Sequence, residues 1–199
     1  MCIGNDDAAS SAERGGNMPF HNKLKLHEAI VFATKAHHGQ VRKGSDVPYM
    51  IHPFETAQIL TEAGCSDEIV IAGLLHDTLE DTETSSTEIS SAFGYKVLGL
   101  VFAASEDKRM EWEDRKQHTI DYLCHEASQD EMLLICADKL SNLRSIRYEK
   151  DTLGEVVWDR FKRGKDKQKW YYEGILNALK PISDYQMYAE YKWLLEELF

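Results

Sequence analysis

Apolar residues recur along most of the chain at the three- and four-residue spacing of amphipathic helices. Apolar positions in residues 26–36 follow this spacing, which predicts a first helix that ends at Gly39. Pro53 is expected to lie in the first turn of a second helix, where proline is tolerated, and Gly64 is expected to end this helix. Phe54 belongs to the apolar face that this second helix is expected to bury.

The most apolar segment of the chain predicts a helix at the centre of the fold. Ile69–Leu75 is apolar on every side, as in helices that are surrounded by other elements. Two later helices are expected to begin with capping boxes, at Ser85-x-x-Glu88 and Ser128-x-x-Glu131. The second of these opens a long helix with an inward-facing stripe formed by Met132, Leu133, Cys136, Leu140 and Leu143.

The remaining segments indicate an all-α fold with a single multi-helix domain at 21–199. Residues 152–163, 165–180 and 183–199 complete the set of expected helices, and no alternating apolar pattern is sustained anywhere. Residues 1–20 are rich in Gly, Ser, Asp and Asn and are expected to be a disordered tail, in which Met18 is an alternative start. In the last helix one face either closes the core or packs against a second copy in a homodimer; it comprises Tyr188, Tyr191, Leu194, Leu195 and Leu198.

Composition narrows the classes of function. The 199 residues contain neither a run of roughly 20 apolar residues nor a secretory signal, so no membrane partner is expected. The net charge of −11 argues against nucleic acid as a partner, and a polyanionic ligand would need a metal or a local basic patch. The cysteines show no C-x-x-C pair and are expected to be reduced thiols of a cytoplasmic protein: Cys2, Cys65, Cys124 and Cys136.

Histidines and aspartates interrupt the buried pattern at three places. His76 and Asp77 close the most apolar helix, Asp138 lies within the inward stripe, and His52 begins another packed helix. Buried imidazoles and carboxylates are costly unless they are paired or bound to a metal. We therefore expect these four side chains to surround one divalent cation, Mn²⁺, Fe²⁺ or Zn²⁺, that leaves positions for water and a phosphate oxygen.

A pair of acids follows these expected ligands. Glu80 and Asp81 lie four residues after His76 and Asp77, about one helical turn away. A carboxylate there would hold the attacking water, take its proton or return one to a leaving oxygen. The simpler alternative is a pair of solvated acids at a helix end.

A basic cluster, residues 160–169, offers a place for an anionic ligand. It holds six Lys or Arg and one Asp, a local charge of +5, and Trp170, Tyr171 and Tyr172 follow directly. We expect a basic wall beside an aromatic surface for a base, with Lys165, Lys169 and Tyr171 as substrate-binding residues. The alternative is a solvated amphipathic helix.

His118 and His125 are seven residues apart on an expected helix. They either bind a second metal ion or form part of a surface face.

Three linked motifs resemble the hydrolase domain of RelA/SpoT homologues, most closely the stand-alone small alarmone hydrolases of the metazoan SpoT-homologue type. They are A-H-H-G-Q-V-R-K-G-S-D-V-P-Y-M-I-H-P (36–53), L-L-H-D-T-L-E-D-T (74–82) and C-A-D-K-L-S-N-L-R (136–144). The resemblance covers residues 24–147, and residues 150–199 do not match the longer enzymes closely.

The resemblance implies an HD-superfamily fold and hydrolysis of the stringent-response alarmone (p)ppGpp at its 3′-pyrophosphate. The adenine counterpart (p)ppApp is left open as a second substrate. The products are pyrophosphate and a 3′-hydroxyl nucleotide, and the cofactor is Mn²⁺, with Zn²⁺, Fe²⁺ or Co²⁺ as alternatives. The motif positions imply metal ligands at His52, His76, Asp77 and Asp138, catalytic acids at Glu80 and Asp81, and nucleotide contacts at Arg42, Lys43, Ser45 and Asn142.

The sequence leaves base preference and two other functions open. Ser141 replaces a larger His or Tyr of the family, which would widen the base pocket and leaves the choice of guanine or adenine undecided. An HD-type nucleotidase or dNTP phosphohydrolase would use the same ligands, and a non-catalytic nucleotide sensor would keep the fold without turnover. A scaffold with a purely structural metal is a third alternative.

Overall fold

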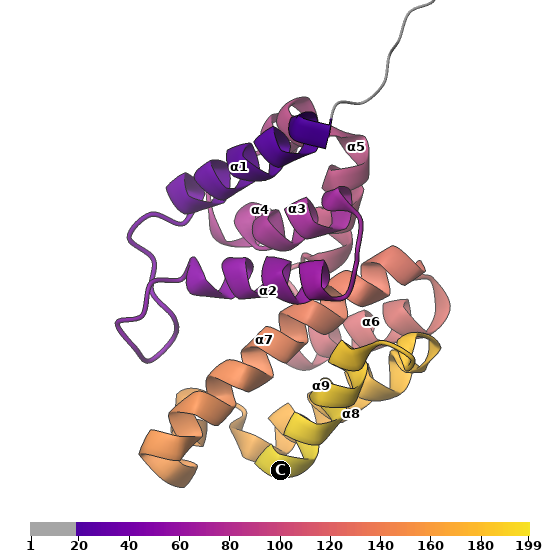
Figure 1. Ribbon diagram of the computed structural model, residues 1–199. Helices are drawn as coiled ribbons and strands as arrows, with labels where there is room; N and C mark the ends of the chain where they lie inside the picture. Colours follow the sequence, from indigo (N-terminus) through magenta and orange to yellow (C-terminus); the bar gives the residue numbers. More distant parts are fainter. Residues whose placement is uncertain (1–18) are drawn as a thin grey trace, which may run out of the picture.

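A computed structural model describes residues 19–199 of the chain, with side chains from Lys23 onward, and its regular elements are helices (Figure 1). Within this range there is no β-strand, and Val41 and Pro48 form one isolated antiparallel bridge. The predicted all-α class is therefore confirmed. The elements are α1 (Pro19–Ala36), α2 (Ile51–Glu62), α3 (Asp67–Leu75), α4 (Thr78–Asp81), α5 (Ser86–Ala104), α6 (Trp112–His125), α7 (Gln129–Leu153), the 3-10 helix η1 (Gly154–Arg160), α8 (Gly164–Ala178), the 3-10 helix η2 (Lys180–Ile182) and α9 (Gln186–Leu198).

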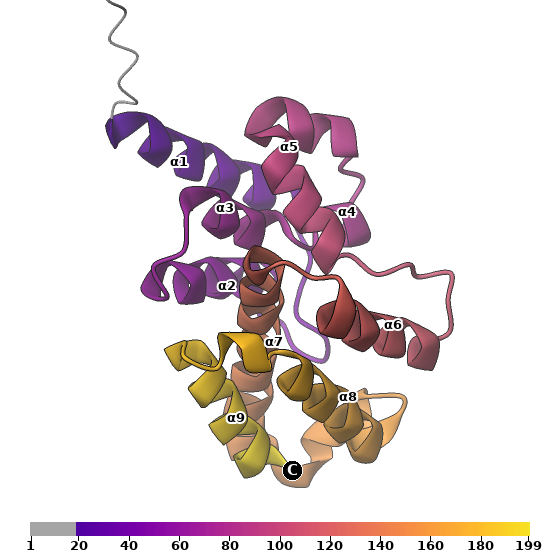
Figure 2. The ribbon, with the colours of Figure 1, turned by 90° about the vertical axis from the view of Figure 1, so that its right-hand side faces the viewer.

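The apolar helix α3 lies at the centre, as its composition predicts. Every residue of Ile69–Leu75 is buried, and α3 packs against α1, α2, α5 and α7. The long helix α7 extends beyond this group, and α9 packs along its C-terminal half. The helix α8 packs against α6 and against α9 (Figure 2). The helix α7 thus connects the group of helices around α3 with the C-terminal helices.

Both predicted capping boxes are present. The side chains of Ser85 and Ser128 accept hydrogen bonds from the backbone N–H groups of Glu88 and Glu131. In return, the two glutamates accept from the N–H groups of the serines at 2.8 and 2.7 Å. Reciprocal caps of this kind satisfy free donors at a helix start, so local sequence defines where α5 and α7 begin.

A glycine allows α2 and α3 to approach closely. A Cβ atom at Gly73 would lie 2.7 Å from Cδ1 of Leu60 and 3.4 Å from the backbone of Ala57. Since interiors are packed without spare volume, only glycine fits here without displacing its neighbours. This approach brings the first turn of α2 next to the C-terminal end of α3.

Two expectations about individual elements are wrong. Phe54 is 52% exposed, because the inward positions of this turn of α2 are taken by His52, Pro53 and Thr56. The segment 152–163 is not a separate α-helix: α7 continues to Leu153 and is followed by the 3-10 helix η1. Gly154 has φ of 63°, a left-handed value that ends α7.

The first and last described helices are α1 and α9. The helix α1 begins at Pro19, and the rest of the expected tail, including the choice of Met18 as a start, lies outside the described residues. The apolar face of α9 closes the core, with Tyr191, Leu194, Leu195 and Leu198 buried. Among the described helices, none combines the length and the apolar character that crossing a bilayer requires.

Candidate metal centre

The four expected metal ligands come from three segments and meet inside the protein. His52 lies in the first turn of α2, His76 and Asp77 join α3 to α4, and Asp138 lies within α7. The Nε2 atoms of His52 and His76 are 3.1 Å apart. Asp138 Oδ1 lies 3.2 Å from His52 Nε2, and Asp77 Oδ2 lies 3.0 Å from His76 Nε2. Both imidazoles and the side chain of Asp138 are buried.

The hydrogen bonds of the two imidazoles leave both Nε2 atoms facing the cluster. His76 Nδ1 lies 2.8 Å from the Gly73 carbonyl oxygen, which only accepts, so Nδ1 carries the proton. His52 Nδ1 lies 2.9 Å from the hydroxyl of Ser141. In the neutral rings, two nitrogen lone pairs and two carboxylates would therefore point at one site. A divalent cation fits this donor set, because ligand atoms of His52, His76 and Asp138 all lie within 4.8 Å of one another.

The electrostatics of the cluster favour a positive charge at its centre. Burial opposes ionisation of Asp77, but the facing His76 outweighs it and lowers the pKa of this carboxyl. Burial acts in the same direction on Asp138, whose pKa is held well below its ordinary value chiefly by Lys139, 2.7 Å away. Burial lowers the pKa of His52. At His76 burial also lowers the pKa, but Asp77 and Asp138 outweigh it and raise the pKa to about 9.

Tyr49 contacts the expected metal ligand Asp77, and the sequence analysis did not single out this tyrosine. Its hydroxyl donates a hydrogen bond of 2.6 Å to Asp77 Oδ2. Burial and the nearby carboxylate of Asp77 raise the pKa of this hydroxyl well above its ordinary value, so it stays a donor. His37 lies against the Tyr49 ring, with centroids 5.0 Å apart, and shares a 2.8 Å hydrogen bond with Gln40. The sequence could have pointed to Tyr49 through its position, three residues before the expected ligand His52.

The acidic pair lies in the short helix α4 beside the cluster. Glu80 Oε2 accepts a hydrogen bond of 3.0 Å from the backbone N–H of Glu106, and burial raises the pKa of Glu80. Lys108 pairs with Asp81 Oδ1 and donates at 3.0 Å to the backbone carbonyl of Glu80. The loop between α5 and α6 thus holds both acids through Glu106 and Lys108, which the sequence did not single out.

A cavity of about 670 Å³ adjoins His52 and is lined by residues of α2, α7 and the α1–α2 loop. Arg42 and Ser45, two expected nucleotide contacts, are among the lining residues. The guanidinium of Arg42 donates at 2.7 Å to Asn142, whose amide donates at 2.8 Å to Asp138 Oδ1. Asn142 therefore connects the cavity wall to the expected metal ligand Asp138.

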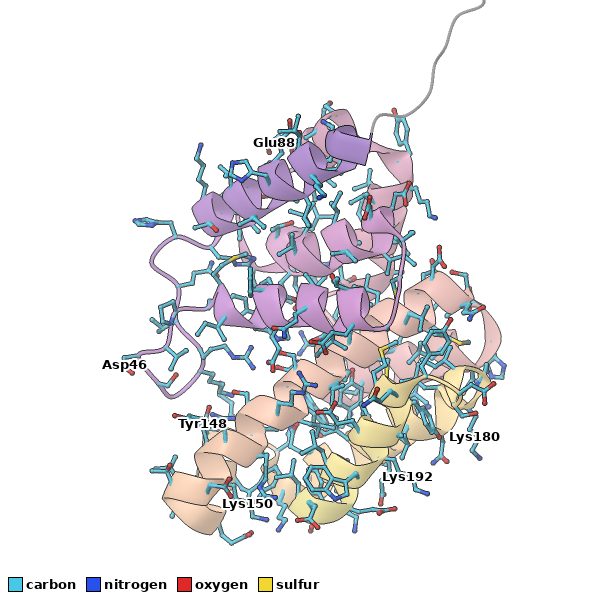
Figure 3. All side chains as sticks on the ribbon, viewed as in Figure 1. Asp46, Glu88, Tyr148, Lys150, Lys180 and Lys192 are labelled. Atoms are coloured by element: carbon cyan, nitrogen blue, oxygen red, sulfur yellow. The ribbon has the colours of Figure 1, made fainter. Side chains whose placement is uncertain are left out.

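The cavity lies where the α1–α2 loop faces α7. Figure 3 shows Asp46, in the α1–α2 loop, and Tyr148, on α7, on the same side. The cavity is lined by Ser45 and Val47 of this loop and by Tyr148. Lys43, the remaining expected contact from the loop, is exposed, and its Nζ lies 5.6 Å from the centroid of the Phe161 ring.

Part of the expected basic wall lies near the cavity, because Arg160 donates a hydrogen bond of 3.3 Å to the Lys43 carbonyl in the α1–α2 loop. Lys165 pairs with Glu155 at 2.9 Å, and Lys169 lies 3.9 Å from Glu173; neither lysine lines the 670 Å³ cavity. Tyr171 is only 3% exposed and the adjacent Tyr172 is also buried, so these two rings do not form an exposed surface in this structure. Both rings are buried because α8 packs against α6 and α9.

Lysines of α6 and α7 lie near the expected metal ligands. Lys116 and Lys139 lie over the Tyr171 ring, 4.6 and 5.8 Å from its centroid. Lys116 also pairs with Glu106 at 2.6 Å. Among the described residues, the group of His52, His76 and Asp138 is the one with metal-binding geometry, and it does not include His118 or His125.

The chain is similar to known proteins in sequence and in fold. Residues 29–158 match the HD domain family. The human protein guanosine-3′,5′-bis(diphosphate) 3′-pyrophosphohydrolase MESH1 is 42% identical over 125 residues, which cover 61% of this chain and 69% of the human protein.

Two solved structures are also similar. The crystal structure of lmo0812 from Listeria monocytogenes EGD-e is 43% identical, with a TM-score of 0.70, and the match covers 74% of this chain and 98% of the Listeria chain. A metazoan ortholog of SpoT, described as hydrolysing ppGpp and acting in starvation responses, is 28% identical with a TM-score of 0.70. That match covers 88% of this chain and 93% of the other.

Proposed function

Because the chain belongs to the HD domain family, we propose that it is a metal-dependent hydrolase of (p)ppGpp-type alarmones. The reaction would remove the 3′-pyrophosphate and yield pyrophosphate and a 3′-hydroxyl nucleotide. The observation that carries the proposal is the convergence of His52, His76, Asp77 and Asp138 beside a cavity of about 670 Å³, with Glu80 in the adjoining helix. The relatives named for this reaction support it.

The cluster is proposed to hold one divalent cation, with His52, His76, Asp77 and Asp138 as its ligands. We propose Mn²⁺, since a mixed set of imidazoles and carboxylates suits it, and Zn²⁺, Fe²⁺ and Co²⁺ are the alternatives. When bound, the cation would supply Lewis acidity toward a water molecule and toward phosphate oxygens.

Glu80 and Asp81 are proposed to handle the protons. Glu80 would orient the attacking water and accept its proton, because burial raises the proton affinity of this carboxylate while the Glu106 N–H fixes one of its oxygens. Asp81, paired with Lys108, would assist transfer of a proton to the leaving 3′-oxygen. Lys108 would also offset negative charge that approaches the two acids.

The nucleotide is proposed to lie in the cavity beside His52. Arg42 is held there by Asn142 and lies over the ring of Tyr49, 5.7 Å from its centroid. A fixed guanidinium at the cavity wall suits recognition of phosphate oxygens. We propose Arg42, Lys43, Ser45 and Asn142 as the substrate contacts.

The test is a product analysis with the chelator-stripped protein, resupplied with Mn²⁺. Incubation with ppGpp should yield GDP and intact pyrophosphate on nucleotide chromatography, and pppApp in a parallel reaction measures base preference. Loss of 5′-phosphates would contradict the proposal. Turnover of dNTPs in place of alarmones would indicate a dNTP phosphohydrolase, and tight binding without turnover would indicate a sensor.

A cytoplasmic location is also proposed. Cys65, Cys124 and Cys136 are free thiols in the described part of the chain. Free thiols persist in reducing compartments. An alarmone hydrolase would meet its nucleotide substrate in the same compartment.

A further inference from the structure

A hydroxyl and a carboxylate lie behind the metal ligand His52 in an unbroken chain of hydrogen bonds. His52 Nδ1 lies 2.9 Å from Oγ of Ser141, and this hydroxyl donates at 2.7 Å to Oε2 of Glu55. Ser141 is 1% exposed and His52 is 2% exposed, so both partners of this bond are buried. These hydrogen bonds connect α2 and α7, the two helices that supply His52 and Asp138.

The direction of these bonds determines which ring nitrogen of His52 carries the proton. A carboxylate only accepts, so the single hydroxyl proton of Ser141 is committed to Glu55. The oxygen of Ser141 then accepts the proton of His52 Nδ1. His52 Nε2 is left as a lone pair that points at His76 and Asp138.

The two histidines of the cluster are oriented in different ways. His76 donates to the backbone carbonyl of Gly73, which every residue type would provide at that position. His52 depends on two side chains, Ser141 and Glu55. A substitution at Ser141 or Glu55 can therefore remove the groups that orient the His52 ring, without altering the backbone or any proposed metal ligand.

Glu55 is itself held at both oxygens. Its Oε1 accepts from Nη1 of Arg144 at 3.2 Å, and its Oε2 accepts from Ser141. Arg144 is fixed in turn by two bonds of 2.7 Å to the carboxylate of Glu190 in α9. Bidentate pairs of this kind have restricted geometry, so α9 helps to hold the carboxylate behind His52.

We propose that Ser141 and Glu55 are positioning residues for the metal ligand His52, which they hold in the tautomer and orientation that binds the cation. The inference rests on the proposed metal site and is independent of the identity of the substrate. Partners that orient metal-binding histidines are worth about 10- to 100-fold in metal affinity. Loss of the Ser141 hydroxyl should therefore weaken Mn²⁺ binding by that factor.

The chain offers a matched control in the same helix and the same cavity. Ser145 lies one turn beyond Ser141 and also lines the cavity, but its hydroxyl lies 3.3 Å from Glu149 and does not contact a histidine. Ser141→Ala and Ser145→Ala remove the same atom from the same cavity wall. Only the first variant removes a partner of His52.

The experiment measures the affinity of the chelator-stripped variants for Mn²⁺ alone, from the electron paramagnetic resonance signal of free Mn²⁺. Ser141→Ala should bind about 10- to 100-fold more weakly than wild type. Ser145→Ala should bind like wild type, Ser141→Thr should restore most of the affinity, and Glu55→Gln should fall in between. Nitrogen-15 spectra of the imidazoles should place the His52 proton on Nδ1 in wild type and lose this preference in Ser141→Ala.

Equal Mn²⁺ affinity for Ser141→Ala and Ser145→Ala would overturn the inference. So would an unchanged Mn²⁺ affinity with a raised KM, which would assign Ser141 to substrate contact. Circular dichroism checks that each variant is folded, and Ser141→Thr provides a second comparison if Ser141→Ala is not. The affinities decide this question whether or not the wild type hydrolyses ppGpp, so failure of the proposed reaction is distinguishable from failure of this inference.

Discussion

The hydroxyl of Tyr49 donates a hydrogen bond of 2.6 Å to Asp77 Oδ2, the oxygen that also lies 3.0 Å from His76 Nε2. The same oxygen of Asp77 thus contacts both a tyrosine of the α1–α2 loop and the imidazole of His76. The bond limits rotation of the Asp77 side chain and fixes the direction in which its remaining lone pair points. A loop residue therefore contributes to the geometry of a site that is built from helices.

Tyr49→Phe should weaken Mn²⁺ binding and turnover roughly tenfold, because it removes a hydrogen bond to the proposed metal ligand Asp77 and leaves the ring in place. The free energy of unfolding should fall by only about 1 kcal/mol, the net value of one hydrogen bond. Mn²⁺ titration and urea unfolding measure the two effects. Tyr95→Phe is the control, since Tyr95 is 83% exposed, and an equal loss in both variants would contradict the assigned role.

Glu80→Gln should reduce kcat by about 10²- to 10⁴-fold, the usual contribution of a general base. In the wild type, burial raises the Glu80 pKa above its ordinary value of 4.5. Because the base must be unprotonated, kcat should fall with decreasing pH through this raised pKa, at a higher pH than for an ordinary glutamate.

A profile of kcat against pH at saturating Mn²⁺ checks this prediction. Glu80→Gln should lack the acidic limb that Glu80 causes in the wild type. The exposed Glu83 gives the control variant Glu83→Gln, which should keep the wild-type profile. A Glu80→Gln protein with unchanged kcat would contradict the assignment of Glu80 as the general base.

Removal of the metal should lower the thermal midpoint and leave the helices folded. A ligand at 100 times its Kd adds about 2.7 kcal/mol to the stability of the folded state. For a chain of this size, that corresponds to roughly 5–10 °C. Thermal scans by circular dichroism with EDTA and with Mn²⁺ measure the difference, and Asp138→Asn should show little response to Mn²⁺. Loss of helical signal on chelation at 25 °C would favour the scaffold with a structural metal.

Gly73→Ala should destabilise the protein by about 1–3 kcal/mol, because the added Cβ would lie 2.7 Å from Leu60 and close to the α2 backbone. The variant should also weaken Mn²⁺ binding, since α2 carries His52. Gly99→Ala is the control: nothing lies within 4 Å of its Cβ, and alanine favours the helix by up to about 1 kcal/mol. Urea unfolding of both variants checks the sign, and a stabilised Gly73→Ala would show that α2 and α3 tolerate a wider separation.

Local sequence determined the helices and indicated the candidate ligands. The capping boxes at Ser85 and Ser128 depend on residues three positions apart, and the burial of α3 follows from its uniform apolar composition. His76 and Asp138 could be singled out because each interrupts an apolar pattern, and such an interruption is visible without knowledge of any distant residue.

Tertiary structure decided the contacts that depend on how distant helices pack. The outward position of Phe54 and the burial of Tyr171 follow from the rotation of α2 and α8 against their neighbours, which no single helix specifies. The bonds from Ser141 to Glu55 and to His52 span 86 and 89 residues of sequence. A helical pattern predicts which residues face inward, but a hydrogen bond requires two such faces to meet within about 3 Å, and only the packing of α2 on α7 brings these partners together.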